Sequence, residues 1–509
     1  MKILFNTIFY FIVFLLLFLF LLLINSANFL LNEYMDLDFS VVLYQLSTPL
    51  QGTSHDLLNT YITEYLLVAI VEFLVIFVLV RFISKKLFQR IHYVVACKIG
   101  KKQFRLQISK KHSKRIAAIL LLFIFIGLSG LLYQKVIAVG IPKYISDISQ
   151  DTTLFEDYYV SPNDVELSFP DNKKNLLFIY AESMEVTYAG ALGQNLIPNL
   201  TALADENISF SDRGKDGGLT WYGSTSQTIS AIISASCGLP LKVPIGTFYT
   251  GDYEALLPGA VGIGEVLNSN GYDNYFMCGS DSTFGGRKLW FSQHGNYNIL
   301  DYAMAIEEGI IPEDYYEFWG MEDKYLFEYA KEKLTEISNH DKPFNFTMLT
   351  VDTHMPDGYV CDLCETDKNT DLLATISCSD RQITAFVDWC KEQPWYEDTV
   401  IVIIGDHPHM TEEYFSTLPE GYPRRTYNCI INSSVSPTLD TQSRLASNMD
   451  LFPTTLAAMG ITVEGERLGI GTNLFSNRPT VTEELGLETF TGELSKHSTY
   501  YDINFIYNR

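Results

Sequence analysis

Asn175-Leu-Leu-Phe-Ile-Tyr-Ala-Glu-Ser183 is the stretch of sequence that decides the fold. The run from Leu176 to Ala181 contains no charged residue and does not alternate between polar and apolar positions. Such a run predicts a strand that is buried on both faces, as in a parallel sheet. Runs of the same character occur at 275–278, 344–351 and 399–404, and helical patterns lie between them at 262–269, 323–338 and 380–391. Strands that alternate with helices predict an α/β fold with a mostly parallel sheet covered by helices.

Polar residues follow these strands at the points where the strands end. Glu182 follows the first run, His354 lies three residues after the third, and Asp406 and His407 follow the fourth. The carboxyl ends of parallel strands meet at one edge of a sheet, where such folds place their binding sites. Carboxylate oxygens together with an imidazole nitrogen suit Zn²⁺ or Mn²⁺. We therefore expect a metal site at this edge.

A hydroxyl nucleophile is expected beside this metal. Gly223-Ser-Thr-Ser-Gln-Thr228 leads into an apolar, helix-like stretch from Ile229 to Ala235. A metal ion can hold a threonine oxygen as an alkoxide, and the start of a helix offers N–H donors to a phosphate. Taken singly, each of these features is more often a helix cap or a capped turn. Their conjunction indicates a site that combines a metal with a nucleophile.

The first 139 residues predict a membrane anchor with three transmembrane helices. The apolar runs at about 3–24, 62–80 and 116–137 are long enough to cross a bilayer at about 1.5 Å per residue. Glu72 interrupts the second run; an acid there is costly and often functional, but it equally fits a contact with another helix. A cleaved signal peptide is the alternative for the first run, although its 22 uncharged residues exceed the usual apolar core of such peptides.

Charge is divided unevenly along the chain. Residues 1–139 carry 14 Lys and Arg against 6 Asp and Glu, and the remainder carries 22 against 54. The total of −24 excludes a generic nucleic-acid binder, which needs a basic surface. Twelve basic residues and no acid lie at 81–115, which the positive-inside rule places in the cytoplasm. The chain then divides into a membrane anchor (1–139), a connector (140–172) and an extracytoplasmic catalytic domain (173–509), and the segment 26–60 also faces outward.

Eight cysteines are present, and seven of them lie in the part of the chain expected outside the cell. Cys361, Cys364 and Cys378 are close enough in sequence for one local disulfide, which an extracytoplasmic location permits. The Cys-x-x-Cys spacing at 361–364 has no second pair to match it, so zinc binding there is disfavoured. The spacing alone does not fix the disulfide connectivity.

The order of these motifs resembles the alkaline-phosphatase/sulfatase superfamily. Four of them occur in the order typical of that superfamily: Tyr-Ala-Glu182-Ser, Gly-Ser-Thr225, Val-Asp-Thr-His354 and Gly-Asp406-His407. Within it, the chain is similar to the membrane-anchored phosphoglycerol transferases, which include lipoteichoic acid synthase and the transferase that decorates osmoregulated periplasmic glucans. Three longer segments look especially like the glucan-type branch: Ala235–Pro240, Thr350–Gly358 and Arg467–Phe475. The resemblance covers roughly 170–480 and implies an alkaline-phosphatase-like, sulfatase-type domain behind N-terminal transmembrane helices.

The resemblance also implies which residues hold the metal and attack the substrate. Glu182, Asp406 and His407 match the metal ligands of the family. Thr225 matches the nucleophile, which also contacts the metal, because the superfamily's nucleophile is commonly followed three residues later by Ser or Thr. Thr228 stands at that later position and is the alternative nucleophile.

Three further residues are expected to bind the substrate. His354 matches the histidine that contacts the phosphoglycerol head group, and we also expect it to move a proton. Arg287 matches an arginine that binds the substrate phosphate. Lipoteichoic acid synthase has an aromatic residue two positions before this arginine, where Gly285 stands here, and this difference favours the glucan branch. His409 has no firm counterpart, and we place it with the substrate-binding residues.

The function implied by the resemblance is metal-dependent transfer of glycerophosphate from phosphatidylglycerol to an envelope glycan or a glycerophosphate polymer. The reaction would pass through a covalent phospho-threonine at the outer face of the bacterial inner membrane, with one divalent cation, Mn²⁺ ahead of Zn²⁺ or Mg²⁺. A phosphoethanolamine transferase and a phosphodiesterase of the same superfamily are the alternatives among enzymes. A catalytically inactive sensor that binds lipid or glycan is the alternative outside enzymes. Sulfate hydrolysis is disfavoured because the Cys-x-Pro-Ser-Arg segment, in which sulfatases make formylglycine, is missing.

Overall fold

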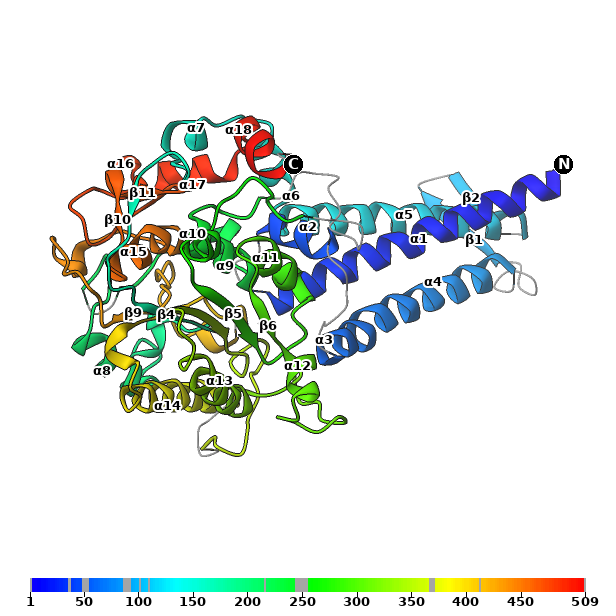
Figure 1. Cartoon of the computed structure of the whole chain (residues 1–509). Helices are drawn as coiled ribbons and strands as arrows, with labels where there is room; N and C mark the ends of the chain where they lie inside the picture. Colours follow the sequence, from blue (N-terminus) through cyan, green and yellow to red (C-terminus); the bar gives the residue numbers. More distant parts are fainter. Residues whose placement is uncertain are drawn as a thin grey trace. The chain divides into compact units, whose positions relative to one another are not determined.

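The structure is a computed structural model, and it consists of two compact units (Figure 1). One unit comprises Met1–Leu37 and His55–Pro142, and the other comprises Asp38–Ser54 and Lys143–Arg509. We call them the helical unit and the sheet unit. The described residues are 2–34, 38–47, 55–85, 93–99, 102–108, 110–214, 217–242, 255–365, 371–411 and 413–507.

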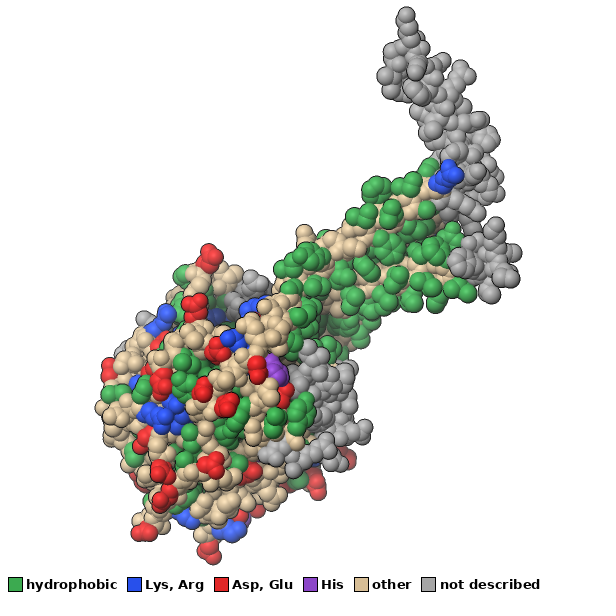
Figure 2. All heavy atoms as spheres, turned by 90° about the horizontal axis from the view of Figure 1, so that it is seen from above, with side chains coloured by type: hydrophobic (Ala, Val, Ile, Leu, Met, Phe, Trp, Pro, Cys, Tyr) green, Lys and Arg blue, Asp and Glu red, His purple; other side chains and the backbone are tan. Residues whose placement is uncertain are grey.

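The helical unit is built on three long helices, α1 (Lys2–Glu33), α4 (Leu67–Lys85) and α5 (Lys110–Ala138), which pack on one another. The short α3 (His55–Thr60) and the π-helix η1 (Tyr61–Leu66) precede α4. Three stretches are long and apolar enough to cross a membrane: Ile8–Glu33, Leu57–Ile83 and Arg115–Ala138. Figure 2 shows the hydrophobic side chains that cover these helices on one face, as expected for side chains that contact lipid.

Two features of the helical unit bear on the sequence analysis. The basic segment contains an antiparallel pair of strands, β1 (Tyr93–Ile99) and β2 (Lys102–Ile108). Within the apolar helices, the amide Nδ2 of Asn25 on α1 donates a hydrogen bond to Oε2 of Glu72 on α4 at 3.0 Å. The interhelical contact considered for Glu72 is therefore present, and it gives this costly acid a polar partner.

A six-stranded sheet forms the centre of the sheet unit, in the order β6-β5-β7-β4-β8-β9. All neighbouring strands are parallel except β9, which runs antiparallel to β8. The predicted α/β fold with a mostly parallel sheet is confirmed. The bounds of the strands are β4 Asn175–Ala181, β5 Asp273–Cys278, β6 Asn298–Leu300, β7 Phe344–Leu349, β8 Thr399–Gly405 and β9 Asn428–Ile431.

Helices cover both faces of this sheet (Figure 1). The helices α9 (Thr228–Cys237), α10 (Ile263–Ser269), α11 (Arg287–Gln293) and α15 (Leu451–Ala458) lie on one face, and α8 (Pro198–Glu206), α13 (Asp323–Ile337) and α14 (Asp371–Lys391) lie on the other. The residues Leu176 and Phe178 of β4 share one buried core with Ile232 and Ile233 of α9. Full burial of such a side chain contributes about 1.5–3 kcal/mol, which explains why the central strands are apolar throughout.

Shorter elements complete the sheet unit. The expected connector at 140–172 contains α6 (Ile141–Ile148), α7 (Leu154–Tyr158) and β3 (Leu167–Ser168). The segment between the first two long helices supplies α2 (Phe39–Ser47). The remaining elements are α12 (Tyr302–Glu307), β10 (Thr462–Val463), β11 (Arg467–Leu468), β12 (Gly471–Thr472), α16 (Val481–Leu485), α17 (Leu487–Ser495) and α18 (Thr499–Tyr501).

The register of the central strands determines which polar residues meet. Ala181, the last residue of β4, is paired with Gly405, the last residue of β8. The residues that follow, Glu182 and Asp406, therefore leave the sheet at the same level. Gly405 is required here, because a Cβ atom on it would lie 1.7 Å from the carbonyl oxygen of Met184. The turn after β4 can thus lie directly against β8.

Candidate metal and nucleophile site

The side chains of Glu182, Asp406 and His407 come together beyond the ends of β4 and β8. One ligand atom from each lies within 4.8 Å of the others. Nε2 of His407 is 3.3 Å from Oδ2 of Asp406 and 3.6 Å from Oε1 of Glu182. All three side chains are buried. The arrangement that the sequence predicted at this edge of the sheet is therefore present as a cluster of two carboxylates and one imidazole.

The free atoms of this cluster fit a divalent cation. Oδ1 of Asp406 accepts hydrogen bonds from the backbone N–H groups of Ser183 and His407, both at 2.8 Å, whereas its buried Oδ2 has no hydrogen-bond partner among the described residues. Nδ1 of His407 donates to the carbonyl oxygen of Pro408 at 3.0 Å, so the neutral ring turns the lone pair of Nε2 toward the cluster. Buried polar atoms normally have partners, so the unpartnered Oδ2 of Asp406 points to a bound cation.

The electrostatics of the cluster lead to the same conclusion. Burial, followed by the charge of Glu182, raises the pKa of Asp406 to about 7. Burial opposes protonation of His407, but the carboxylates of Asp406 and Glu182 outweigh it and raise the pKa of the imidazole. A divalent cation would relieve the repulsion between the two carboxylates, since it supplies positive charge where protons on Asp406 and His407 are otherwise favoured.

Thr228, and not Thr225, is the threonine that the structure brings to this cluster. Oγ1 of Thr228 lies 3.3 Å from Oε2 of Glu182 and 3.4 Å from Nε2 of His407. Oγ1 of Thr225 instead donates to the carbonyl oxygen of Tyr222 at 3.1 Å and accepts from its N–H at 2.9 Å. The geometry thus favours the alternative that the sequence analysis ranked second.

The local conformation explains this difference between the two threonines. Residues Gly223–Thr225 form a short 3-10 turn, η3, and the side chain of Thr225 closes that turn onto its own backbone. Thr228 is the first residue of α9, after Gln227 in an extended conformation. The N-terminal N–H groups of α9 have no partners within the helix, and they carry partial positive charge toward any anion beside Thr228.

The partly buried His354 and the buried His409 each present Nε2, as an acceptor in His354 and as a donor in His409. Nδ1 of His354 donates to the carbonyl oxygen of Met355 at 2.9 Å, so its Nε2 is an acceptor, and burial lowers its pKa to about 4. Nδ1 of His409 accepts from the N–H of Thr411 at 3.2 Å, so its Nε2 carries the hydrogen. That Nε2 is buried and has no partner in the described part of the chain. Burial, helped by nearby Arg424, His354 and His407, holds the pKa of His409 well below its usual value.

Arg287 is linked to His354 through two aromatic rings. Nε and Nη2 of Arg287 donate to the carbonyl oxygens of Phe284 and Asp281, at 3.1 and 2.8 Å. The ring of Trp319 lies 5.1 Å from that of Phe284 and 4.6 Å from that of His354, measured between ring centres. Nε1 of Trp319 is buried, and it has no partner among the residues that the structure describes. Sequence analysis did not single out Trp319, because it lies between motifs and 35 residues before His354.

A buried ion pair supports the loop of His409. Nε of Arg424 donates to Oε2 of Glu185 at 2.9 Å, and Nη2 of the same arginine donates to the carbonyl oxygen of His409 at 2.7 Å. The N–H of His409 in turn donates to Oε1 of Glu185 at 3.2 Å. Removal of either partner would leave the other as an unpaired buried charge, so Glu185 and Arg424 are both needed to hold the loop of His409. Neither residue was expected from the sequence.

The helix α2 packs beside the threonine turn. The hydroxyl of Tyr44, which is 2% exposed, donates to the carbonyl oxygen of Gly285 at 2.7 Å. Nε2 of Gln227 donates to the carbonyl oxygen of Val41 at 3.2 Å. The segment between the first two apolar helices thus contacts the residue that precedes Thr228 and the turn that precedes Arg287.

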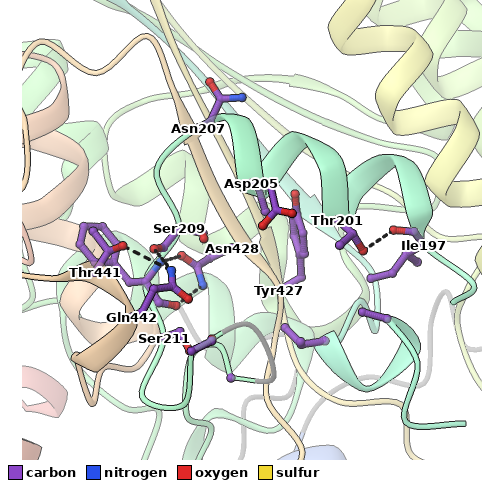
Figure 3. A pocket seen from close by; sticks show the side chains of 16 residues that line it. Ile197, Thr201, Asp205, Asn207, Ser209, Ser211, Tyr427, Asn428, Thr441 and Gln442 are labelled. Atoms are coloured by element: carbon purple, nitrogen blue, oxygen red, sulfur yellow. Dashed lines mark hydrogen bonds between the residues drawn. The ribbon is translucent and has the colours of Figure 1, made fainter.

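A separate cavity of about 470 Å³ lies between α8 and the strand β9 (Figure 3). Some of its polar side chains hydrogen bond within the wall, for example Thr201 to the carbonyl oxygen of Ile197 at 2.7 Å. The metal ligands, Thr228, Arg287 and the two histidines do not line it. The cavity is therefore distinct from the candidate site.

Comparison with protein families identifies the family that this domain resembles. The family model named Sulfatase matches residues 174–461, which is more than half of the chain. The chain belongs to the sulfatase family. Phosphoglycerol transferase I of Escherichia coli (strain 55989 / EAEC) is 30% identical over 332 residues, which are 64% of this chain and 41% of that protein. The match therefore spans less than half the length of that relative. The resemblance to this superfamily and to phosphoglycerol transferases is confirmed.

Solved structures similar to this member of the sulfatase family are more distant in sequence. A protein of the alkaline phosphatase superfamily from Vibrio parahaemolyticus is 22% identical, with a TM-score of 0.49, and the match covers 66% of this chain and 76% of that one. Lipoteichoic acid synthase LtaP from Listeria monocytogenes is 19% identical, with a TM-score of 0.46, over 64% of this chain and 80% of that one.

Proposed function

We propose that this chain is a membrane-anchored phosphoglycerol transferase with Thr228 as its nucleophile. The donor would be phosphatidylglycerol, and the acceptor would be a hydroxyl of an envelope glycan or of a glycerophosphate polymer. The observation that carries the proposal is the position of the Thr228 hydroxyl, between Glu182 and His407 at the start of α9. The identity of 30% to phosphoglycerol transferase I supports the choice of donor.

One divalent cation, Mn²⁺ before Zn²⁺ or Mg²⁺, would be held by Glu182, Asp406, His407 and Thr228. When bound there, such a cation supplies the Lewis acidity that lowers the pKa of a hydroxyl and offsets charge on phosphoryl oxygens. The residues themselves do the positioning. The N–H groups at the start of α9 face the charge that develops on the phosphoryl group, and Glu182 orients the hydroxyl of Thr228.

In the first step, the oxygen of Thr228 attacks the phosphorus of phosphatidylglycerol. The bond from phosphorus to the diacylglycerol oxygen breaks, that oxygen receives the proton that the Thr228 hydroxyl loses, and glycerophospho-threonine remains. In the second step, an acceptor hydroxyl attacks the phosphorus, and Thr228 leaves and regains its proton. His354 is neutral near pH 7, and its acceptor Nε2 can take the proton of the incoming hydroxyl.

The head group and phosphate of the donor need partners of their own. The guanidinium group of Arg287 is held by hydrogen bonds to two carbonyl oxygens, and it provides a positive charge in this acidic domain. The Nε2–H of His409 and the Nε1–H of Trp319 are buried donors that lack partners among the described residues, so each can bond to a phosphate or glycerol oxygen of the substrate. Together these groups would favour glycerol, which offers two hydroxyls, over ethanolamine, which carries a cation.

The topology that the sequence predicts would put the donor in the outer leaflet. The helix α2 lies in the chain between the first two apolar helices, yet it packs within the sheet unit. If all three apolar helices span the membrane, this segment and the catalytic domain must lie on the same side. The basic segment 81–115 then lies on the opposite side, which the positive-inside rule assigns to the cytoplasm.

The proposal is tested with the full-length protein in detergent and phosphatidylglycerol that carries a fluorescent acyl chain. We expect Mn²⁺-dependent release of fluorescent diacylglycerol, loss of this release in Thr228→Ala, and partial retention in Thr228→Ser. Release from phosphatidylethanolamine but not from phosphatidylglycerol would assign the donor to phosphoethanolamine transfer. Absence of release from both lipids in the presence of metal would refute the transferase.

A further inference from the structure

Three cysteines outside the candidate site form a compact cluster. Cys361 and Cys364 lie in the segment that follows His354, and Cys378 lies on α14. The sulfur of Cys361 is 3.7 Å from that of Cys364 and 3.8 Å from that of Cys378, and all three sulfurs lie within 4.8 Å of one another. Cys361 and Cys378 are buried, and Cys364 is partly exposed.

Two of the three distances between the sulfurs, those from Cys361, match the distances in a tetrahedral metal site. A disulfide brings two sulfurs to about 2.05 Å. Zinc binds thiolate sulfurs at about 2.3 Å, and tetrahedral angles then set neighbouring sulfurs about 3.8 Å apart. We propose that Cys361, Cys364 and Cys378 bind one Zn²⁺ as thiolates, in a site separate from the cluster of Glu182, Asp406 and His407. This proposal does not depend on the proposed function.

The surroundings of the cluster suit three thiolates around a dication. The backbone N–H groups of Leu363 and Cys364 donate hydrogen bonds to the sulfur of Cys361. Nε2 of Gln382 donates to the sulfur of Cys378 at 3.5 Å. Nη2 of Arg381 donates to the carbonyl oxygen of Leu363 at 3.1 Å, which holds a positive charge beside the cluster. Donors and a cation around the sulfurs offset the single negative charge that three thiolates and Zn²⁺ leave.

A water molecule would complete the four ligands that zinc prefers. Among the described residues, no fourth Cys, His, Asp or Glu joins the group. The partly exposed Cys364 marks the side of the cluster that solvent reaches. The sequence analysis disfavoured zinc because the Cys-x-x-Cys spacing had no second pair. The structure supplies the third ligand as a single cysteine, Cys378 on α14.

The proposed zinc would join the segment of His354 to α14. The N–H of Gly358 donates to the carbonyl oxygen of His354 at 3.0 Å, and the N–H of Tyr359 donates to that of Asp352 at 2.7 Å. These bonds close the first part of the segment, and the three sulfurs would fix its second part to the helix. Metal at this position would thus stabilise the loop that carries His354.

Cobalt provides a probe that reports this site alone. Co²⁺ replaces Zn²⁺ in tetrahedral sites, and thiolate ligands give it intense charge-transfer absorption in the near ultraviolet, whereas the cluster at Glu182 contains no sulfur. The reduced, metal-stripped full-length protein is titrated with Co²⁺ in detergent. We expect one equivalent to produce this absorption in the wild type and in Asp406→Asn, and added Zn²⁺ to abolish it. Cys361→Ser should lose the absorption. Cys390→Ser, which changes a buried cysteine on α14, the helix that carries Cys378, should keep it.

Two results would overturn the proposal. One is the absence of the charge-transfer absorption in the reduced wild type. The other is a disulfide between two of the three cysteines in the protein as isolated, detected by peptide mass spectrometry without reductant. If Cys361→Ser does not fold, Cys364→His tests the site instead, because histidine can replace one thiolate ligand. Weaker absorption with unchanged metal stoichiometry supports the zinc site. Unchanged absorption contradicts it.

Discussion

The hydroxyl Oγ1 of Thr228 lies 3.3 Å from the carboxylate Oε2 of Glu182. These residues come from distant parts of the sequence, one from the start of a helix and the other from the end of the central strand β4. The contact places the Thr228 hydroxyl beside a carboxylate that can also bind a metal ion. It lies at the N-terminus of α9, which attracts anions. This relationship connects the fold to the proposed chemistry.

Replacement of Thr228 should affect activity far more than replacement of Thr225. Thr228→Ala removes the attacking oxygen, so release of diacylglycerol should fall on the order of 10³-fold or more. Thr225→Ala removes only hydrogen bonds within η3, each contributing about 1 kcal/mol, so activity should fall by about tenfold or less. The comparison uses initial rates with fluorescent phosphatidylglycerol, and thermal unfolding checks that both variants fold. Equal losses in the two variants would argue against a distinct role for Thr228.

Metal affinity should rise with pH and level off above about pH 7. Burial and the charge of Glu182 raise the pKa of Asp406 to about 7, whereas an unfolded carboxyl titrates near 4. Between these values the folded, metal-free protein holds a proton that the unfolded chain has lost, so its stability falls as pH rises through this window. A cation displaces the proton, so the apparent Kd for Mn²⁺ should rise at least about tenfold for each pH unit below 7, and more steeply where His407 is also protonated.

This pH dependence is measured by titration calorimetry. Titrations near pH 6 in buffers of different ionisation enthalpy should show release of between about one and two protons per bound Mn²⁺, from Asp406 and His407, and titrations near pH 8 should show less release. Asp406→Asn removes the titrating carboxyl and should abolish tight binding at both pH values. An affinity that does not change between about pH 5.5 and pH 8 would show that Asp406 is already ionised in the metal-free protein.

Tyr44→Phe should weaken the turn that precedes Arg287. The variant leaves the carbonyl oxygen of Gly285 without its donor in a buried position, at a cost of about 1–3 kcal/mol. We expect a lower unfolding temperature and a higher KM for phosphatidylglycerol. Tyr133→Phe is the control, because this tyrosine on α5 is 66% exposed. Similar behaviour of both variants would show that the contact of α2 does not support the site.

A chain that begins at Lys143 should be impaired for the same reason. It lacks α2 and so loses the contacts of Tyr44 with Gly285 and of Val41 with Gln227. We expect this truncated protein to have a lower unfolding temperature and lower activity, even on a short-chain lipid that needs no membrane. Addition of a peptide with the sequence of residues 38–47 should restore part of the activity. Full activity of the truncated protein alone would contradict a role for α2.

Trp319→Phe separates substrate binding from packing. Phenylalanine keeps a ring against Phe284 and His354 but lacks the N–H group that is buried without a partner in the described structure. If Nε1 donates to the substrate, KM should rise about five- to tenfold, the equivalent of one hydrogen bond, while the unfolding temperature stays the same or rises. An unchanged KM would remove Trp319 from the binding site and leave it a packing role.

Several parts of the site could be predicted because they depend on local pattern and sheet topology. The apolar run before Glu182 and the run before Asp406 predict neighbouring buried strands, and parallel strands bring their carboxyl ends to one edge. The register of Ala181 with Gly405 then sets the two acids side by side. The mostly parallel sheet and the helices on both faces follow from the same alternation of strands and helices.

The proposal of Thr228 as the nucleophile depends on a local feature that the sequence pattern does not contain. Thr225 and Thr228 are three residues apart, and both precede an apolar helix. The side chain of Thr225 closes a 3-10 turn, and α9 begins only at Thr228, so just one of the two hydroxyls reaches Glu182. Boundaries of helices are the least predictable part of a sequence, and here one turn decides which hydroxyl is available.

The contact of α2 and the cysteine cluster depend on residues that are apart in the sequence. Tyr44 meets Gly285 across 241 positions of the sequence, and Cys378 on α14 meets Cys361 across 17 positions. Trp319 lies in an irregular stretch, where no periodicity marks a side chain as functional. No spacing rule predicts such contacts, because they depend on how the loops pack on the sheet.

The measurement that tests the central claim most directly is peptide mass spectrometry of the covalent intermediate. The full-length protein is incubated with phosphatidylglycerol and Mn²⁺ without an acceptor, quenched in acid and digested. The account predicts a glycerophosphate group on Thr228 in the wild type and in Thr225→Ala, and no such group in Asp406→Asn. A glycerophosphate group on Thr225, or steady release of diacylglycerol with both threonines unmodified and no burst of product, would contradict it.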